Sequence, residues 1–266
     1  LGLDRAPEVR TLREKLAQLG QPEPVAAWAG ALCQDWMAAD PEAAGTLYVD
    51  GHVRVYHGGA AHLPQHYVSR QRLCLRATTD YWVNAADGQP FFVVHRPIDP
   101  GLLRVLEEEI VPRLEQEVPG QPSAQALAAD PCLSKFTLVF DREGYSPDCF
   151  QRLRTRRLAV LTYHKHPGPD WPAEEFQTHS VKLAHGQEVE MELAERGVRL
   201  SNGLWVREIR HRDRSGAQTA ILTTHFRLAL TAVARAMFAR WSQENFLKYM
   251  RQHYALDHLV APGAEP

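Results

Sequence analysis

Apolar residues recur at helical spacing at both ends of the chain and alternate with polar residues in much of the sequence between. Near the start they lie three or four positions apart, at Val9, Leu12, Leu16 and Leu19. This period predicts a helix over residues 6–19, followed by an Ala- and Trp-rich helix over 23–39. At the other end, residues 228–255 are expected to form one long helix.

Short runs rich in β-branched and aromatic residues predict strands between these helices. The first group covers residues 46–50, 53–56, 73–83 and 90–96, with turns expected at Gly51-His52 and Asp87-Gly88. The second group covers residues 135–140 and 158–163, and helices are expected over 100–118 and 147–157. This order of elements indicates a mixed sheet with helices packed against it.

Residues 176–226 carry a different pattern. The polar positions Glu188, Glu190 and Glu192 alternate with the apolar positions Val189, Met191 and Leu193. Such alternation is typical of a strand with one exposed face. Turn signals at hairpin spacing occur at His185-Gly186, Asn202-Gly203 and Ser215-Gly216. We therefore expect this stretch to be a β-rich insertion before the last helix.

These patterns divide the chain into five parts. The helical segment over 1–44 is expected to be the tail of an N-terminal region missing from this sequence, which does not begin with Met. The other parts are the first part of an α/β core at 45–175, the β-rich insertion at 176–226, the final core helix at 227–258 and a flexible tail at 259–266.

Composition excludes several classes of protein. The chain has 266 residues, 44% of them hydrophobic and 23% charged, so it is neither disordered nor collagen-like. No apolar run reaches membrane-spanning length, so no membrane partner is expected. Four scattered cysteines with no C-x-x-C pair fit neither a zinc module nor a disulfide framework and favour a reducing compartment. The net charge is −2, but residues 131–266 hold 19 Lys and Arg against 15 Asp and Glu, so a polyanionic partner would favour this half.

Three carboxylates stand out by their position. Asp50 closes the first predicted strand, Asp141 closes a later one, and Glu244 lies inside the last helix. Two carboxylates at the ends of neighbouring strands and a third on a helix packed nearby would form an oxygen cluster suited to Mg²⁺. Two such ions can activate a water or a hydroxyl for phosphoryl transfer. The alternative is that Asp50 and Asp141 simply begin turns, as Asp often does.

On the predicted last helix, basic residues lie on the same face as Glu244. At 100° per residue, three basic side chains fall within about 40° of Glu244, namely Arg240, Lys248 and Arg251. Arginine suits phosphate because its planar fork donates two parallel hydrogen bonds. The alternative is a solvated helix face with Glu–Lys pairs four positions apart.

Arginines also crowd the predicted strand before Ser215-Gly216, at Arg207, Arg210, Arg212 and Arg214. They would form either a phosphate-contacting edge of the insertion or an ordinary charged hairpin. His164 directly follows a predicted strand, so it would lie either near an active-site cleft or in a surface turn.

Three blocks of the chain resemble the catalytic blocks of DDE transposases. They are Tyr48-Val-Asp50-Gly-His-Val-Arg-Val-Tyr56, Thr137-Leu-Val-Phe-Asp141-Arg-Glu-Gly-Tyr145 and Arg240-Trp-Ser-Gln-Glu244-Asn-Phe246. Within that family the blocks are most similar to those of bacterial insertion-sequence transposases, which have an RNase H-like core and a β-strand insertion. Their signature on the last helix has a Tyr three residues before the Arg and a Lys seven after the Glu, where this chain has Met237 and Arg251.

The resemblance implies an α/β fold, an RNase H-like mixed β-sheet flanked by helices, with the β-rich insertion before the last helix. It also implies hydrolysis at transposon ends, followed by strand transfer of the 3′-hydroxyl into target DNA, with no covalent protein–DNA intermediate. Asp50, Asp141 and Glu244 would then be the catalytic residues and the ligands of two Mg²⁺ or Mn²⁺ ions.

The expected partner is DNA, both of the transposon terminal repeats and of the target. The residues expected to contact it are Arg240, Lys248, Arg251, Arg207, Arg210 and Arg212. A homodimer in the DNA complex and a bacterial cytoplasmic location are expected with it. Two alternatives stay open: a non-catalytic DNA-binding relic of a transposable element, against which the intact carboxylates argue, and a non-transposing RNase H-like nuclease, which the insertion and the Arg-x-x-x-Glu helix disfavour.

Overall fold

The structure, a computed structural model of the chain, describes residues 8–20, 22–56, 63–68, 72–96, 99–183 and 186–254. At positions 22–26, 66 and 240–246 it describes the backbone only. His185 of a predicted turn and the predicted tail over 259–266 lie outside the described residues.

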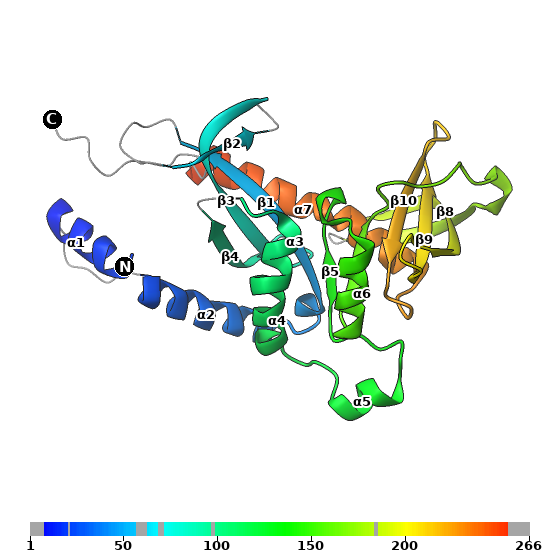
Figure 1. Cartoon of the computed structure of the whole chain (residues 1–266), viewed down its shortest axis with the longest axis horizontal. Coiled ribbons are helices and arrows are strands. Elements are labelled where there is room, and N and C mark those ends of the chain that lie inside the picture. The colour runs from blue at the N-terminus through cyan, green and yellow to red at the C-terminus, as the bar shows by residue number, and fades with distance from the viewer. Residues whose placement is uncertain are drawn as a thin grey trace.

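The described residues form a mixed sheet with helices on both faces (Figure 1). The strands are β1 (Thr46–Val55), β2 (Gln65–Val68), β3 (Leu73–Asn84), β4 (Pro90–Arg96), β5 (Thr137–Val139), β6 (Ala159–Tyr163), β7 (Gln177–Lys182), β8 (Glu188–Arg199), β9 (Trp205–Arg212) and β10 (Gln218–Thr223). The helices are α1 (Val9–Leu19), α2 (Pro22–Ala39), α3 (Leu102–Val105), α4 (Val111–Glu117), α5 (Ala124–Ala129), α6 (Pro147–Thr155) and α7 (Leu230–Tyr254). A π-turn over Leu106–Ile110 joins α3 to α4, and the short 3₁₀ helix η3 (Arg142–Gly144) follows β5.

The strands run in the order β2-β3-β1-β5-β6-β10-β9-β8-β7, and β4 pairs with the other part of β3. The three central strands β1, β5 and β6 are parallel to one another. On one side, β3 is antiparallel to β1 and β4 is antiparallel to β3. On the other side, β10 pairs antiparallel with β6 and leads into the antiparallel strands β9, β8 and β7. The β-rich stretch therefore continues the central sheet.

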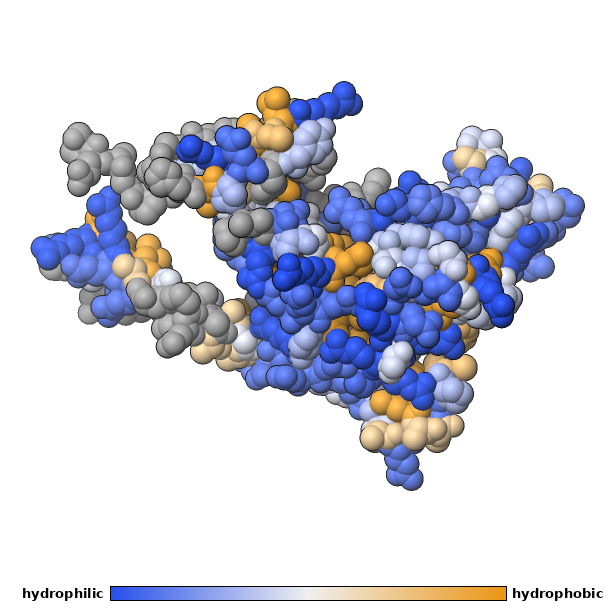
Figure 2. Space-filling model, viewed as in Figure 1, coloured by the Kyte–Doolittle hydropathy of each residue, from blue (hydrophilic) through white to orange (hydrophobic). Residues whose placement is uncertain are grey.

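Alternation along the strands divides the interior into two apolar clusters. On β1, Leu47 and Val49 enter a cluster with buried residues of α2, α3, α4 and α6, whereas Tyr48 enters a cluster with buried residues of α7. In the view of Figure 1, α3, α4 and α6 lie in front of the sheet and α7 runs behind it. The front face of the molecule is mainly hydrophilic (Figure 2). We call the two sides of the sheet the α6 face and the α7 face.

Helix α7 crosses its face of the sheet diagonally and contacts β1, β5, β6, β7 and β9. Val233, Ala234 and Met237 are buried against the strands. The Tyr48 hydroxyl donates a hydrogen bond of 2.8 Å to the carbonyl oxygen of Ala236. This contact fixes the point at which α7 crosses β1.

Most elements predicted from the sequence are present, and the mixed α/β class is confirmed. The β3–β4 hairpin turns at Asp87-Gly88, where Gly88 has a φ of 93° that an L side chain rarely adopts. The predicted turn at Gly51-His52 is wrong, because residues 50–55 pair in unbroken register with residues 82–77 of β3. The short elements β2 and α5 were not predicted, and the domain boundaries stay a prediction.

None of the helices in the described part of the chain combines the length and apolarity needed to cross a membrane.

Candidate functional site

Asp50 lies within β1, and Asp141 lies two residues past the end of the adjacent parallel strand β5. The last register pair between β1 and β5 is Tyr48 with Val139, and each carboxylate follows its strand's member of that pair by two residues. Tyr48 and Val139 both belong to the cluster on the α7 face, so alternation returns both carboxylates to that face. Neighbouring strands are about 4.8 Å apart, so the register predicts that these two half-buried residues lie near each other at one edge of the central sheet.

A tight turn fixes Asp141. Its Oδ1 accepts a hydrogen bond of 2.8 Å from the backbone N–H of Glu143 and so caps η3, and its carbonyl oxygen accepts one of 2.9 Å from the Thr162 hydroxyl on β6. The turn requires Gly144, because a Cβ there would lie 2.3 Å from the buried Phe140 ring. Asp141 therefore does begin a turn, as the simpler alternative had it, and it does so beside Asp50.

Asp50 sits within β1 rather than at its end. The β1–β5 ladder stops before it, while β1 continues beside β3 to Val55. Its Oδ1 accepts a hydrogen bond of 3.1 Å from the backbone N–H of Gly51.

The third predicted carboxylate, Glu244, lies on α7, at a position where only the backbone is described. In a helix of 100° per residue, position 244 falls about 20° from the buried residues Val233 and Met237. At Val233 and Met237 this stripe of α7 faces the sheet. Among the side chains that the structure describes, which do not include that of Glu244, no group of three His, Cys, Asp or Glu could hold a metal ion.

Of the three basic residues on α7 that were predicted to contact DNA, the structure describes two side chains. Lys248 is exposed and Arg251 is half-buried, whereas the Arg240 side chain lies outside the described ones. Met237, which stands where the resembled signature has a Tyr, is buried among the apolar residues of the α7 face.

Sequence analysis missed a polar cluster on the α7 face beside Asp50. Register pairs place His52 opposite Asp80 on β3, and Asp80 opposite His95 on β4, so these side chains share the α7 face with Asp50. The buried Asp80 carboxylate lies 2.8 Å from Nε of Arg54 and 2.7 Å from Nδ1 of His95. We call Asp80, Arg54 and His95 the Asp80 triad. Its signal in the sequence is one acidic residue inside a run that otherwise reads as a buried strand.

The arginines predicted to contact DNA from β9 all have carboxylate partners on the protein. Arg207 pairs with Glu195 on β8 at 2.6 Å and also donates to two backbone carbonyl groups. Arg212 pairs with Glu192 at 3.0 Å. Arg210 is buried, its Nε lies 2.6 Å from Oε1 of Glu208, and it donates to the carbonyl oxygen of Pro169. A phosphate contact at Arg210 would require this network to open.

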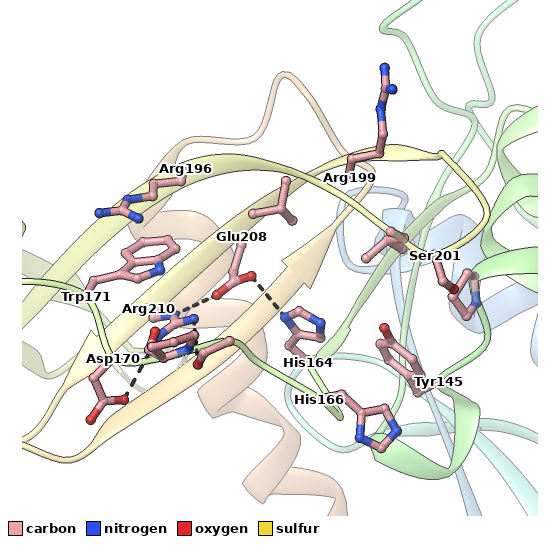
Figure 3. A pocket seen from close by; sticks show the side chains of 15 residues that line it. Tyr145, His164, His166, Asp170, Trp171, Arg196, Arg199, Ser201, Glu208 and Arg210 are labelled. Atoms are coloured by element: carbon pink, nitrogen blue, oxygen red, sulfur yellow. Dashed lines mark hydrogen bonds and ion pairs between the residues drawn. The ribbon is translucent and has the colours of Figure 1, made fainter.

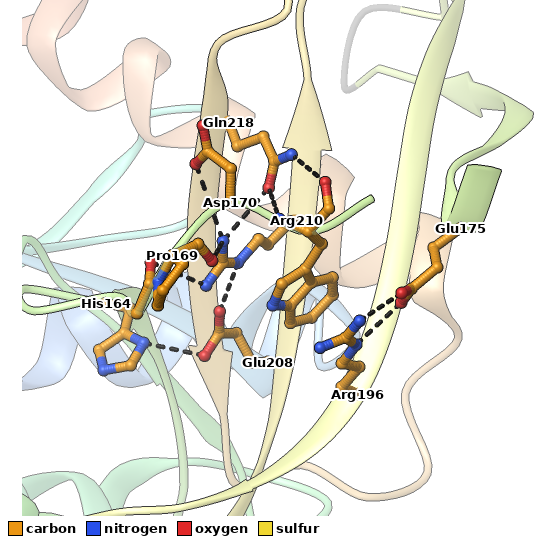
Figure 4. A network of polar contacts seen from close by, with 10 residues as sticks. His164, Pro169, Asp170, Glu175, Arg196, Glu208, Arg210 and Gln218 are labelled. Atoms are coloured by element: carbon orange, nitrogen blue, oxygen red, sulfur yellow. Dashed lines mark hydrogen bonds and ion pairs between the residues drawn. The ribbon is translucent and has the colours of Figure 1, made fainter. Parts of the chain in front are cut away.

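A pocket of about 650 Å³ lies next to Arg210 on the α6 face (Figure 3). Glu208 lies on this face because it alternates with Ile209, which enters the α7-side cluster. His164, just after β6, places Nδ1 2.9 Å from Oε2 of Glu208. We call Glu208, Arg210 and His164 the Glu208 triad. The ring of Trp171 packs against Arg210 and also against Arg196, which pairs with Glu175 (Figure 4).

The electrostatics of the Glu208 triad are those of a closed internal network. Burial opposes ionisation of Glu208, but hydrogen bonds from His164 and Arg210 outweigh it and hold the pKa of the carboxyl below its ordinary value. Figure 4 shows the Arg210 guanidinium enclosed by the loop at Pro169 and by the Gln218 side chain. The triad therefore ties that loop to the sheet, on the face opposite Asp50 and Asp141.

Comparison with known proteins gives a family and a distant structural likeness. A protein-family model described as "Transposase protein" matches residues 1–265. A solved structure titled "Cryo-EM structure of piggyBac transposase synaptic complex with hairpin DNA (SNHP)" is similar over 97% of this chain and 50% of that chain, with 10% sequence identity and a TM-score of 0.47. The chain thus spans about half the length of the chain in that structure. No curated protein matches.

Proposed function

The chain belongs to the transposase protein family, and on that premise we propose that it is the catalytic core of a DDE-type DNA transposase of the bacterial insertion-sequence kind. It hydrolyses DNA at transposon ends and joins the 3′-hydroxyl to target DNA. Asp50, Asp141 and Glu244 are its catalytic carboxylates. A homodimer on the DNA and a place in the bacterial cytoplasm belong to the same proposal.

The observation that carries the proposal is the arrangement of the two strand carboxylates under α7. Asp50 and Asp141 share one edge and one face of adjacent parallel strands, and that face is covered by the helix that carries Glu244. Ligand sites in such sheets form at the carboxyl ends of the strands. The strand order β4-β3-β1-β5-β6, with only β3 antiparallel to its neighbours, supports an RNase H-like core.

The residues present fit a hard divalent cation. Asp50 and Asp141 offer carboxylate oxygens without a nearby thiolate, which is the ligand type that Mg²⁺ and Mn²⁺ prefer. Glu244 would complete the set from α7. When bound, such ions lower the pKa of an attacking water or hydroxyl and stabilise the leaving oxygen. The chain's own part is to hold the carboxylates, and the Asp141 cap on η3 and the Tyr48 bond to α7 do this.

DNA would lie along the α7 face, where the carboxylates are. Lys248 and Arg251, and Arg240 by its place on the helix, supply positive charge there. The β9 arginines would contribute less, because each one already neutralises a glutamate.

The test is nicking of DNA that carries the terminal repeats flanking the chain's own gene. Asp141→Ala should abolish nicking supported by Mg²⁺ or Mn²⁺, while its affinity for the same DNA in EDTA stays that of the parent. The matched control is Glu174→Ala, which removes an exposed carboxylate far from the edge and should nick normally. Metal-dependent nicking by Asp141→Ala at the parent's rate would remove that residue from the site.

A further inference from the structure

The Asp80 triad lies on the face that carries Asp50 and Asp141, yet the proposed chemistry does not use it. The Asp80 side chain is only 5% exposed, and both of its oxygens are occupied. Oδ2 faces Nε of Arg54 at 2.8 Å, and Oδ1 accepts a hydrogen bond of 3.2 Å from Nη2 of Arg54 and faces His95 at 2.7 Å. A carboxylate held in this way by a guanidinium is unsuited to a metal ion, because the ion would meet a positive charge beside it.

The Arg54 and His95 side chains of this triad reach the surface. The Arg54 side chain is 21% exposed and His95 is 51% exposed. Within the described part of the chain, Nη1 of Arg54 and Nε2 of His95 have no hydrogen-bond partner. Asp80 therefore fixes one edge of the Arg54 guanidinium and leaves the other edge for a ligand. A planar guanidinium pre-oriented in this way is suited to a phosphate, to which it can donate two parallel hydrogen bonds.

The position along β1 relates this site to the carboxylates. Arg54 lies on the same face as Asp50 and four residues further along the strand, a separation of about 13 Å between backbones. The long Arg54 side chain covers part of that separation. Phosphates follow one another every 3.4 Å along the axis of one DNA strand. A strand with one phosphate at the carboxylate pair would thus bring another to Arg54 within a few nucleotides.

We propose that Arg54 and His95, held in place by Asp80, bind a backbone phosphate of DNA a few nucleotides from the phosphate that is cleaved. The proposal rests on the function proposed above, since that function puts DNA on the α7 face. Arg54 and His95 contact the phosphate, and Asp80 is a positioning residue. His95 adds a second donor in its protonated form.

The experiment is a salt titration of DNA affinity in EDTA, with the full chain and a short duplex of arbitrary sequence. Arg54→Gln should flatten the slope of log affinity against log salt by about 0.9, the value for one lost phosphate contact. Arg54→Lys should keep the parent slope but bind more weakly, because lysine lacks the fork. The matched control is Arg104→Gln on α3, which removes an exposed arginine paired with Glu108 on the α6 face and should leave the slope unchanged.

A second variant keeps the test decisive if Arg54→Gln does not fold. His95 is half-exposed, so His95→Gln is compatible with folding, and it should weaken DNA binding severalfold at a pH where histidine is protonated. A parent-like slope in folded Arg54→Gln would overturn the proposal, and where that variant does not fold, parent-like affinity in His95→Gln would overturn it. Because these measurements need no metal, loss of the nicking activity proposed for Asp141 leaves their outcome unaffected, and the two proposals fail separately.

Discussion

The sheet carries two triads of the same composition on its opposite faces. Each has a buried carboxylate, an arginine and a histidine: Asp80 with Arg54 and His95 on the α7 face, and Glu208 with Arg210 and His164 on the α6 face. They differ in the exposure and the further hydrogen bonds of their arginines. Arg210 is 3% exposed and donates its remaining hydrogen bonds to the protein, whereas Arg54 is 21% exposed and its Nη1 has no hydrogen-bond partner among the residues that the structure describes.

The difference shows that a buried carboxylate can serve two ends. Where the arginine is enclosed, as at Glu208, the pair ties a loop to a strand and its value is in folding. Where the arginine reaches the surface, as at Asp80, the carboxylate holds the guanidinium in an orientation that we propose serves to bind a phosphate. The two triads have similar composition, and it is the exposure of the guanidinium that distinguishes them.

Removal of the two carboxylates should affect stability unequally. Glu208→Ala leaves the enclosed Arg210 charge without its partner, so we expect a loss of about 3–5 kcal/mol in the free energy of unfolding. Asp80→Ala leaves Arg54 able to turn toward water, and we expect a loss of about 1–3 kcal/mol. Urea unfolding of both variants measures this. Equal losses of unfolding free energy in the two variants would mean that both triads contribute to folding in the same way.

The turn at Gly144 separates the carboxylate edge from the pocket, since Asp141 precedes it and Tyr145 follows it. In Gly144→Ala the new Cβ meets the Phe140 ring, so the turn must shift at a cost of about 1–3 kcal/mol. Because Asp141 moves with the turn, we expect the nicking rate to fall by more than the loss of folded protein accounts for. A folded variant with parent-like nicking would show that the edge tolerates the shift.

The predicted DNA edge on β9 has its sharpest test in Arg212. It is the most exposed of the three arginines predicted to contact DNA there, with 33% of its side chain accessible. Because Glu192 already pairs with it, Arg212→Gln should flatten the salt dependence of DNA binding less than Arg54→Gln does. If Arg212→Gln flattened that slope by as much as one lost phosphate contact, β9 would be part of the DNA-binding surface.

The pH dependence of stability gives a finer contrast. The pKa of Glu208 is lowered by His164 and Arg210, so its ionised form stabilises the fold above the ordinary value of about 4.5 and loses this effect as the pH falls through the lowered pKa. The difference in unfolding free energy between the parent and Glu208→Gln should therefore be largest near neutral pH and shrink in acid. Thermal unfolding of both proteins across pH measures this difference in free energy. A difference that grew as the pH fell would contradict the ion pair.

The link between the carboxylate edge and α7 rests in part on one hydrogen bond. Tyr48→Phe removes the donor to the Ala236 carbonyl group but keeps the ring, so we expect a loss of about 1 kcal/mol. Hydrogen exchange of α7 amides should show the opening directly. Unchanged protection in this helix would mean that the apolar contacts of Val233 and Met237 suffice.

The sequence alone was enough for most of the elements, whereas the catalytic role of Asp50, Asp141 and Glu244 stays a prediction. Period-2 and period-3.6 patterns are local, so β3, β4 and α7 could be predicted, and Asp50 and Asp141 could be placed on strands by the apolar runs before them. The Gly51-His52 turn was wrong because glycine after aspartate favours turns, while the partner that keeps β1 extended is a distant strand.

Burial of charge could not be predicted in the same way. Asp80 lies inside one strand, and its partners Arg54 and His95 come from two others, so only the register brings them together. Arg210 looked like a surface cation because alternation assigns it to a face without saying what covers that face. The loop that encloses it, at Pro169 and Trp171, is far away in sequence.

The central claim is that Asp50, Asp141 and Glu244 share bound metal at one edge of the sheet. Its most direct test is binding of Mn²⁺, followed by electron paramagnetic resonance, in the full chain and in Asp50→Asn, Asp141→Asn and Glu244→Gln. We predict that the chain binds Mn²⁺ and that each of the three variants weakens binding at least tenfold, whereas Glu174→Gln, which changes an exposed carboxylate, binds as the parent does. Parent-like affinity in Glu244→Gln would contradict the claim, because α7 would then supply no ligand.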